Sequence, residues 1–297
     1  MGIYVSKYGL ELEIIKKKSA GPGRNTVGTG LKWAPTGRKW VGTGLKTVVF
    51  AIFLISGLSL FAQSKKDIHI IYIGDSITQG VQLSDPNTQS PPAAASDHIQ
   101  SLHGTGRMDF SNQGHSGYTT VDFLPGGETF KQLELATSGL AGKPGLLIFS
   151  VMLGTNDSAI KGPNGSPVSP DAYYSNLKTI IDQLLKDYPR CKVIIHHPIW
   201  YSPNTYNGAQ YLQEGLDRLQ SYFPEITKLV NSYSETSKGQ VFTGDTKAFD
   251  YFKKTHLTTL IPENGHQGTF YLHPNQAGAK YLGIFWARAI YRDAIAK

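Results

Sequence analysis

The chain has 297 residues, of which 40% are hydrophobic and 17% are charged, so its composition is that of an ordinary globular protein. The formal charge of +7 lies wholly in residues 1–62, which hold nine Lys and Arg and two Asp and Glu, because residues 63–297 hold twenty of each sign. This balance gives residues 63–297 no basic excess of the kind that binds nucleic acid, and we expect no nucleic-acid partner.

Residues 1–45 form a basic N-terminal extension for which we expect no fold. They are rich in Gly, Lys and Arg, repeat Val-Gly-Thr-Gly-Leu-Lys at 27–32 and 41–46, and show neither helical nor strand periodicity. Such a long segment before an export signal is unusual. A start site assigned too far upstream would explain it, although no Met lies between Met1 and Met108.

Residues 46–62 resemble a secretory signal peptide, with Lys46 before an apolar run of about fifteen residues that ends at Ala62. A membrane span needs roughly 20 apolar residues, and this run stops at Gln63-Ser-Lys-Lys. We therefore expect cleavage near Ala62 and export to the periplasm or the exterior. Leu60 stands where a signal peptidase prefers a small residue, so retention of the segment as a membrane anchor is an alternative. We expect a stable membrane partner only if the segment is retained.

Residues 63–297 alternate apolar runs with segments of helical spacing. The apolar runs predict buried strands at 68–73, 146–153 and 193–197, with shorter strands at 109–112 and 240–243. Helical spacing predicts helices at 93–102, 170–186, 211–222 and 276–296, and leaves open whether the third continues past Pro224. This alternation predicts a single α/β domain, a three-layer α/β/α sandwich with a mainly parallel, flavodoxin-like central sheet. Cys191 is the only cysteine and is expected in a buried strand, so no internal disulfide is predicted.

Polar motifs follow the predicted strands, at the edge where parallel sheets bind their ligands. Gly74-Asp75-Ser76 comes directly after the first strand, and Gly74 can take the tight turn that exposes Ser76 Oγ. A serine hydroxyl becomes a nucleophile only with a base in hydrogen-bond reach and with donors for the developing oxyanion. Alone, this motif is equally consistent with a serine that caps a helix.

Three further motifs follow in order: Asn112-Gln113-Gly114-His115-Ser116-Gly117, Gly154-Thr155-Asn156-Asp157 and Leu272-His273-Pro274-Asn275. Together with the first, they resemble the four sequence blocks of the SGNH (GDSL-like) hydrolase family, over nearly all of residues 68–290. The resemblance implies a serine esterase with Ser76 as nucleophile and His273 as its general base. It also implies an oxyanion hole formed by the N–H groups of Ser76 and Gly114 and the side-chain amide of Asn156, and no cofactor.

The orienting acid of the family is missing from its usual place. The family places an Asp three residues before the histidine, where this chain has Phe270. The nearest upstream carboxylate is Glu263, in a segment that we expect to be a loop able to fold back toward the imidazole. A backbone carbonyl or water, giving a Ser–His dyad, is a second candidate, and Asp245 or Asp250 a third.

The other acidic and histidine residues give no metal signature. His196-His197 lack a Cys or carboxylate at metal-ligand spacing, so we predict no metal. Asp75 and Asp157 are expected to organise their own loops through hydrogen bonds to the backbone.

Aromatic and amide side chains crowd the expected rim, and sugars are commonly bound by aromatic stacking and amide hydrogen bonds. We therefore expect an acylated carbohydrate or small-molecule ester as substrate, with Gln113, His115 and Trp200 as candidate binding residues, although Trp200 is as readily explained by loop packing. The residues at 268–279 resemble exported bacterial sialate O-acetylesterases, which implies removal of an O-acetyl group from a sugar such as sialic acid. The alternatives are an esterase acting on plant or microbial polysaccharide and a non-catalytic carbohydrate-binding protein of the same fold.

Overall fold

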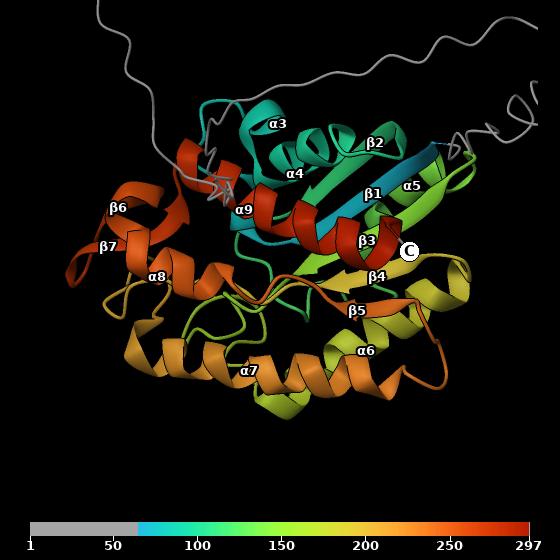
Figure 1. Cartoon of the computed structure of the whole chain (residues 1–297). Helices are drawn as coiled ribbons and strands as arrows, with labels where there is room; N and C mark the ends of the chain where they lie inside the picture. Colours follow the sequence, from blue (N-terminus) through green and yellow to red (C-terminus); the bar gives the residue numbers. More distant parts are fainter. Residues whose placement is uncertain (1–64, 297) are drawn as a thin grey trace, which may run out of the picture. The chain divides into compact units, whose positions relative to one another are not determined.

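The computed structural model describes residues 65–296, so the predictions for residues 1–45 and 46–62 lie outside the described part. Within it, five parallel strands form one sheet in the order β2-β1-β3-β4-β5 (Figure 1). The strands are β1 (Lys66–Gly74), β2 (Thr105–Gly114), β3 (Leu146–Met152), β4 (Lys192–Ile195) and β5 (Val241–Thr243). The predicted parallel α/β fold is confirmed.

Helices cover both faces of this sheet. On one face α4 (Pro91–Gln100) packs beside α9 (Gln276–Ile290), and on the other α6 (Pro170–Asp187) packs beside α7 (Leu212–Ser232) (Figure 1). The side chains of β1 explain this layering, because Ile68, Ile70, Ile71, Tyr72 and Ile73 are all fully buried. A strand covered on both faces needs such a continuous apolar run.

The predicted helices differ from the observed ones in where they end, and four observed helices have no predicted counterpart. α7 continues through Pro224, and the last helix changes at Tyr291 into a π-helical turn, Tyr291–Ile295. Four helices were not predicted: α2 (Ser76–Gln79), α3 (Pro86–Gln89), α5 (Glu128–Ala141) and α8 (Ala248–Thr259). Among the described residues, no helix has the length and apolar character needed to cross a membrane.

A β-hairpin outside the main sheet is the largest departure from the prediction. Residues that we expected to form a loop are β6 (Leu260–Gly265), which pairs antiparallel with β7 (Gly268–Pro274). In this register Glu263 lies opposite Phe270. Phe270 is buried in the core, so its pairing with Glu263 ties β6 to the packed body of the domain.

Candidate active site

The carboxyl end of β1 places Ser76 at the site. The chain turns at Asp75, whose carboxylate accepts a hydrogen bond from Ile77 N at 2.9 Å and caps the short helix α2. A Cβ on Gly74 would lie 2.0 Å from Thr78 Oγ1 and 2.8 Å from Met152 O, so only glycine fits at this turn. Ser76 is therefore held directly at the strand end.

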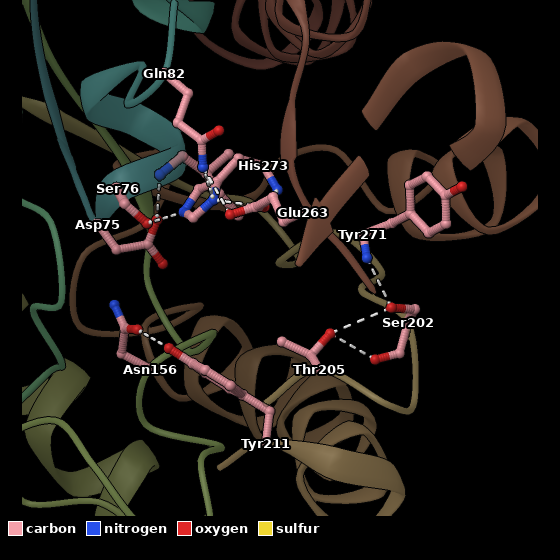
Figure 2. A network of polar contacts seen from close by, with 11 residues as sticks. Asp75, Ser76, Gln82, Asn156, Ser202, Thr205, Tyr211, Glu263, Tyr271 and His273 are labelled. Atoms are coloured by element: carbon pink, nitrogen blue, oxygen red, sulfur yellow. Dashed lines mark hydrogen bonds and ion pairs between the residues drawn. The ribbon is translucent and has the colours of Figure 1, made fainter. Parts of the chain in front are cut away.

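Three predicted residues meet in one hydrogen-bonded chain (Figure 2). Ser76 Oγ lies 3.0 Å from His273 Nε2, and His273 Nδ1 lies 2.9 Å from Glu263 Oε1. Glu263 Oε1 also accepts a hydrogen bond from the His273 backbone N–H at 3.2 Å. Because an ionised carboxylate only accepts, Nδ1 carries the imidazole proton and Nε2 is left to accept from the serine hydroxyl.

Glu263 is ionised in this arrangement. Burial opposes its charge, but hydrogen bonds from His273 and Gln82 outweigh that cost and hold the pKa of Glu263 below its ordinary value. Its side chain is 13% exposed and that of His273 is 9% exposed, so little solvent reaches the pair. A charged acceptor therefore faces His273 Nδ1, while His273 Nε2 faces Ser76 Oγ.

The other candidate acids lie elsewhere. Asp245 accepts hydrogen bonds from the backbone N–H groups of Lys247 and Ala248 at the start of α8, and Asp250 is exposed in the first turn of that helix. Of the candidate acceptors, Glu263 is the one that the structure brings to His273 Nδ1.

Gln82 also contacts this pair, and no sequence motif indicated it. Its Nε2 donates a hydrogen bond to Glu263 Oε2 at 2.6 Å and lies 3.2 Å from His273 Nδ1 (Figure 2). Gln82 follows α2 in the chain, and its backbone is left-handed, with φ of 71°. Sequence spacing cannot reveal a contact between residues 181 positions apart.

Asn156 follows β3 and is held in one orientation. Its Oδ1 accepts a hydrogen bond from the Tyr211 hydroxyl at 2.7 Å, and its Nδ2 donates to Tyr118 O at 2.9 Å. Figure 2 shows the amide nitrogen turned away from Tyr211, toward the segment that carries Ser76. An amide NH₂ has two hydrogens, so one remains for a substrate oxygen. Tyr211, which no motif indicated, holds the oxygen of the amide and so fixes the direction of its NH₂ group.

Gly114 lies at the end of β2, next to α2. Its N–H donates to Asn112 Oδ1 at 3.0 Å, and Asn112 Nδ2 donates in turn to Thr78 O at 3.0 Å. A Cβ on Gly114 would lie 2.3 Å from Gln79 N. Glycine is thus required for close packing against α2, and its N–H already has a partner inside the protein.

The three candidate substrate-binding residues lie in different surroundings. Gln113 donates from Nε2 to Ser111 Oγ at 2.8 Å, along its own strand. The His115 ring stacks on Tyr118 with centroids 4.8 Å apart, and burial lowers its pKa. Trp200 is only 6% exposed and packs against His256. These contacts give Trp200 a place in the hydrophobic core, not the open ring face that sugar stacking needs.

Two buried carboxyl groups lie beneath the site. Burial raises the pKa of Asp75 to about 6 and that of Asp157 to about 7. Asp157 Oδ1 accepts hydrogen bonds from both the backbone N–H and the hydroxyl of Thr120. Both carboxyl groups therefore organise the loops around them. No cluster of three or more His, Cys, Asp or Glu side chains suited to a metal occurs between residues 65 and 296.

Comparison with solved structures shows the same fold. Solved structures with the same fold include a putative GDSL-like lipase from Parabacteroides merdae ATCC 43184, with a TM-score of 0.53, 15% identity, and coverage of 76% of this chain and 96% of the other. A lipase/acylhydrolase from Enterococcus faecalis gives a TM-score of 0.51 at 19% sequence identity, and the match covers 75% of this chain and 94% of the other. Est24, a carbohydrate acetylesterase from Sinorhizobium meliloti, gives a TM-score of 0.51 at 19% sequence identity. The match covers 75% of this chain and 98% of Est24.

No curated protein sequence matches the chain. Residues 72–281, by contrast, match the model of the GDSL-like lipase/acylhydrolase family, and this segment contains Ser76, Gly114, Asn156, Glu263 and His273. The chain therefore belongs to the GDSL-like lipase/acylhydrolase family and is a carboxylic ester hydrolase.

Proposed function

We propose that the protein is a serine esterase that removes O-acetyl groups from a carbohydrate through an acyl-Ser76 intermediate. The observation that carries the mechanism is the continuous chain from Ser76 Oγ through both nitrogens of His273 to Glu263. A nucleophile, a base and an orienting acid in this order are the elements of acyl transfer by serine.

In the first half of the reaction, Ser76 Oγ attacks the ester carbonyl carbon while its proton passes to His273 Nε2. The Asn156 amide donates to the oxygen that becomes negative, and the Glu263 carboxylate stabilises the imidazolium. Collapse of the tetrahedral intermediate breaks the ester C–O bond, and His273 returns the proton to the departing alcohol. Acetyl-Ser76 remains.

In the second half, a water molecule gives its proton to His273 Nε2 and its oxygen attacks the acetyl carbon. The bond between the acetyl carbon and Ser76 Oγ then breaks, His273 returns the proton to Oγ, and acetic acid leaves and ionises to acetate. Each step uses the same donors and the same base, so the enzyme returns to its starting state without a cofactor.

An acetylated sugar is the substrate class that the residues favour. The stacked His115–Tyr118 pair lies next to Asn156, because Tyr118 O accepts from the Asn156 amide. Flat aromatic surfaces beside an amide suit a sugar ring. The fold is also that of Est24, a carbohydrate acetylesterase. The resemblance of the sequence at residues 268–279 to sialate O-acetylesterases favours sialic acid as the sugar. The signal-like sequence at residues 46–62 favours export to the periplasm or the exterior.

Two alternatives remain distinct from this proposal. An acetylesterase acting on plant or microbial polysaccharide would use the same residues. A non-catalytic carbohydrate-binding protein was suggested by the missing Asp before His273, and Glu263 now removes that reason.

The test is release of p-nitrophenol from p-nitrophenyl acetate, followed by release of acetate from a panel of O-acetylated sugars. We expect turnover that falls at least about 10³-fold in Ser76→Ala. Equal activity in the variant would refute the acyl-serine mechanism. Faster release from acetylated polysaccharides than from O-acetylated sialic acid would favour the polysaccharide alternative, and binding without turnover would favour the carbohydrate-binding protein.

A further inference from the structure

Gln82 joins two parts of the site that are remote in sequence. It belongs to the loop after α2, and it contacts Glu263 on β6 and His273 on β7. Glu263 Oε1 accepts from the imidazole and from the His273 backbone, so Oε2 is the carboxylate oxygen that needs another partner. Gln82 Nε2 supplies it at 2.6 Å. All of these contacts keep Oε1 directed at Nδ1.

The backbone at Gln82 is unfavourable for a glutamine. Leu83 N donates to Gly80 O at 3.2 Å, which makes residues 80–83 a tight turn, and Gln82 occupies it with φ of 71°. Glycine or asparagine adopts this conformation more readily than glutamine. Residues with an unfavourable backbone persist mostly at functional sites. The presence of glutamine at this position is therefore best explained by the contacts of its side chain.

The chemistry of an amide suits this place. A lysine or arginine would also donate to Oε2, but its positive charge would offset the negative charge that the imidazolium needs during acyl transfer. A neutral amide fixes the carboxylate and leaves that charge in place. Gln82 is itself exposed, and its side chain covers a pair that is almost wholly buried.

We propose that Gln82 is a positioning residue that acts through Glu263, holding the carboxylate in the orientation that keeps His273 Nε2 ready to accept the Ser76 proton. The inference rests on the proposed function, because it assigns a part in the same acyl transfer. The ionisable groups that act on His273 are Glu263 from β6 and Asp75 from the turn after β1. Gln82 contributes no charge of its own.

The test uses Gln82→Met, which keeps the length of the side chain and removes the donor, and Gln82→Gly, which also suits the left-handed backbone. Gln183→Met is the matched control, because Gln183 Nε2 donates to Asp187 on α6 in a comparable amide–carboxylate contact at 2.8 Å, outside the site. We measure kcat and KM for p-nitrophenyl acetate and the melting temperature of each variant.

We expect kcat to fall about tenfold in both Gln82 variants, as for the loss of one hydrogen bond to a charged group, with KM changed less than about twofold. The melting temperature of Gln82→Gly should equal or exceed that of the wild type, because the turn favours glycine. In a Glu263→Gln background, Gln82→Met should lower kcat further by less than about twofold, because the carboxylate charge that Gln82 positions is already absent. Gln183→Met should leave kcat unchanged.

Four results would overturn the inference. Unchanged kcat in both Gln82 variants would show that the contact has no role, and a rise in KM alone would show that Gln82 binds substrate instead. Full additivity with Glu263→Gln would show that Gln82 acts elsewhere. A fall in kcat that merely follows a lowered melting temperature would show a structural role. The first of these results, together with loss of activity in Ser76→Ala, would refute this inference while leaving the proposed function intact.

Discussion

Replacement of Glu263 by Gln tests the most specific feature of the site. The change keeps the shape of the side chain and removes its charge. Gln82 Nε2 donates to the Oε2 position, so the new amide will place its oxygen there and direct its NH₂ at His273 Nδ1. A donor at Nδ1 favours the tautomer in which Nε2 carries the proton. That imidazole cannot accept the Ser76 proton.

The magnitude follows from the charge that is lost. Two unit charges about 4 Å apart interact by about 4 kcal/mol at the effective dielectric constant of partly buried pairs, and here both side chains are less than 15% exposed. Part of this energy is retained by dipoles around the ring. We therefore expect a loss of about 3 to 4 kcal/mol in transition-state stabilisation, or about 10²–10³-fold in kcat.

The assay is steady-state hydrolysis of p-nitrophenyl acetate between pH 5 and pH 9, with Glu263→Asp as the variant that keeps the charge one methylene further away. We expect Glu263→Asp to retain more activity than Glu263→Gln at every pH. If Glu263→Gln keeps kcat within about threefold of the wild type while remaining folded, the acceptor at Nδ1 is not needed. The site would then work as a Ser–His dyad.

Two further variants test the groups around the site. Tyr211→Phe removes the donor that fixes the Asn156 amide, so we expect kcat to fall about tenfold and the free energy of unfolding to fall by about 1 kcal/mol. The control Tyr201→Phe should lower the free energy of unfolding similarly and leave kcat unchanged. Equal kinetics in the two variants would contradict the role of Tyr211. Asp157 has a folded-state pKa of about 7 against an ordinary 3.8, so the native state binds the extra proton and stability falls as pH rises through this window. In Asp157→Asn, thermal melting should show a weaker fall in stability between pH 4 and pH 8, and an unaltered pH dependence would refute the assignment.

The strands and the order of the four motifs could be predicted because each depends on local sequence. The run Ile68–Ile73 is apolar apart from His69 and ends at a glycine turn, which indicates a buried parallel strand. Ser76 and Asn156 lie within four residues of the ends of β1 and β3, and parallel strands in one sheet present those positions at one edge. His273 follows from its motif before α9. The candidate nucleophile, base and amide donor could therefore be proposed from the sequence alone.

Short or irregular elements escaped prediction for physical reasons. The segment at 260–265 contains Pro262, Asn264 and Gly265 and lacks strand alternation, so β6 forms because it pairs with β7 and not from its own propensity. α7 continues through Pro224 because packing of its buried face outweighs one missing hydrogen bond.

The hairpin register is what decides the third member of the site. An acid three residues before the histidine would have been visible in the sequence, but here that position is the buried Phe270, and the carboxylate comes from Glu263, which lies opposite it. The contacts of Gln82 and Tyr211, the close packing of Gly114 against α2 and the burial of Trp200 were likewise decided by tertiary structure. Each depends on the pairing of segments that are distant in the chain, and no local pattern of residues encodes such a pairing.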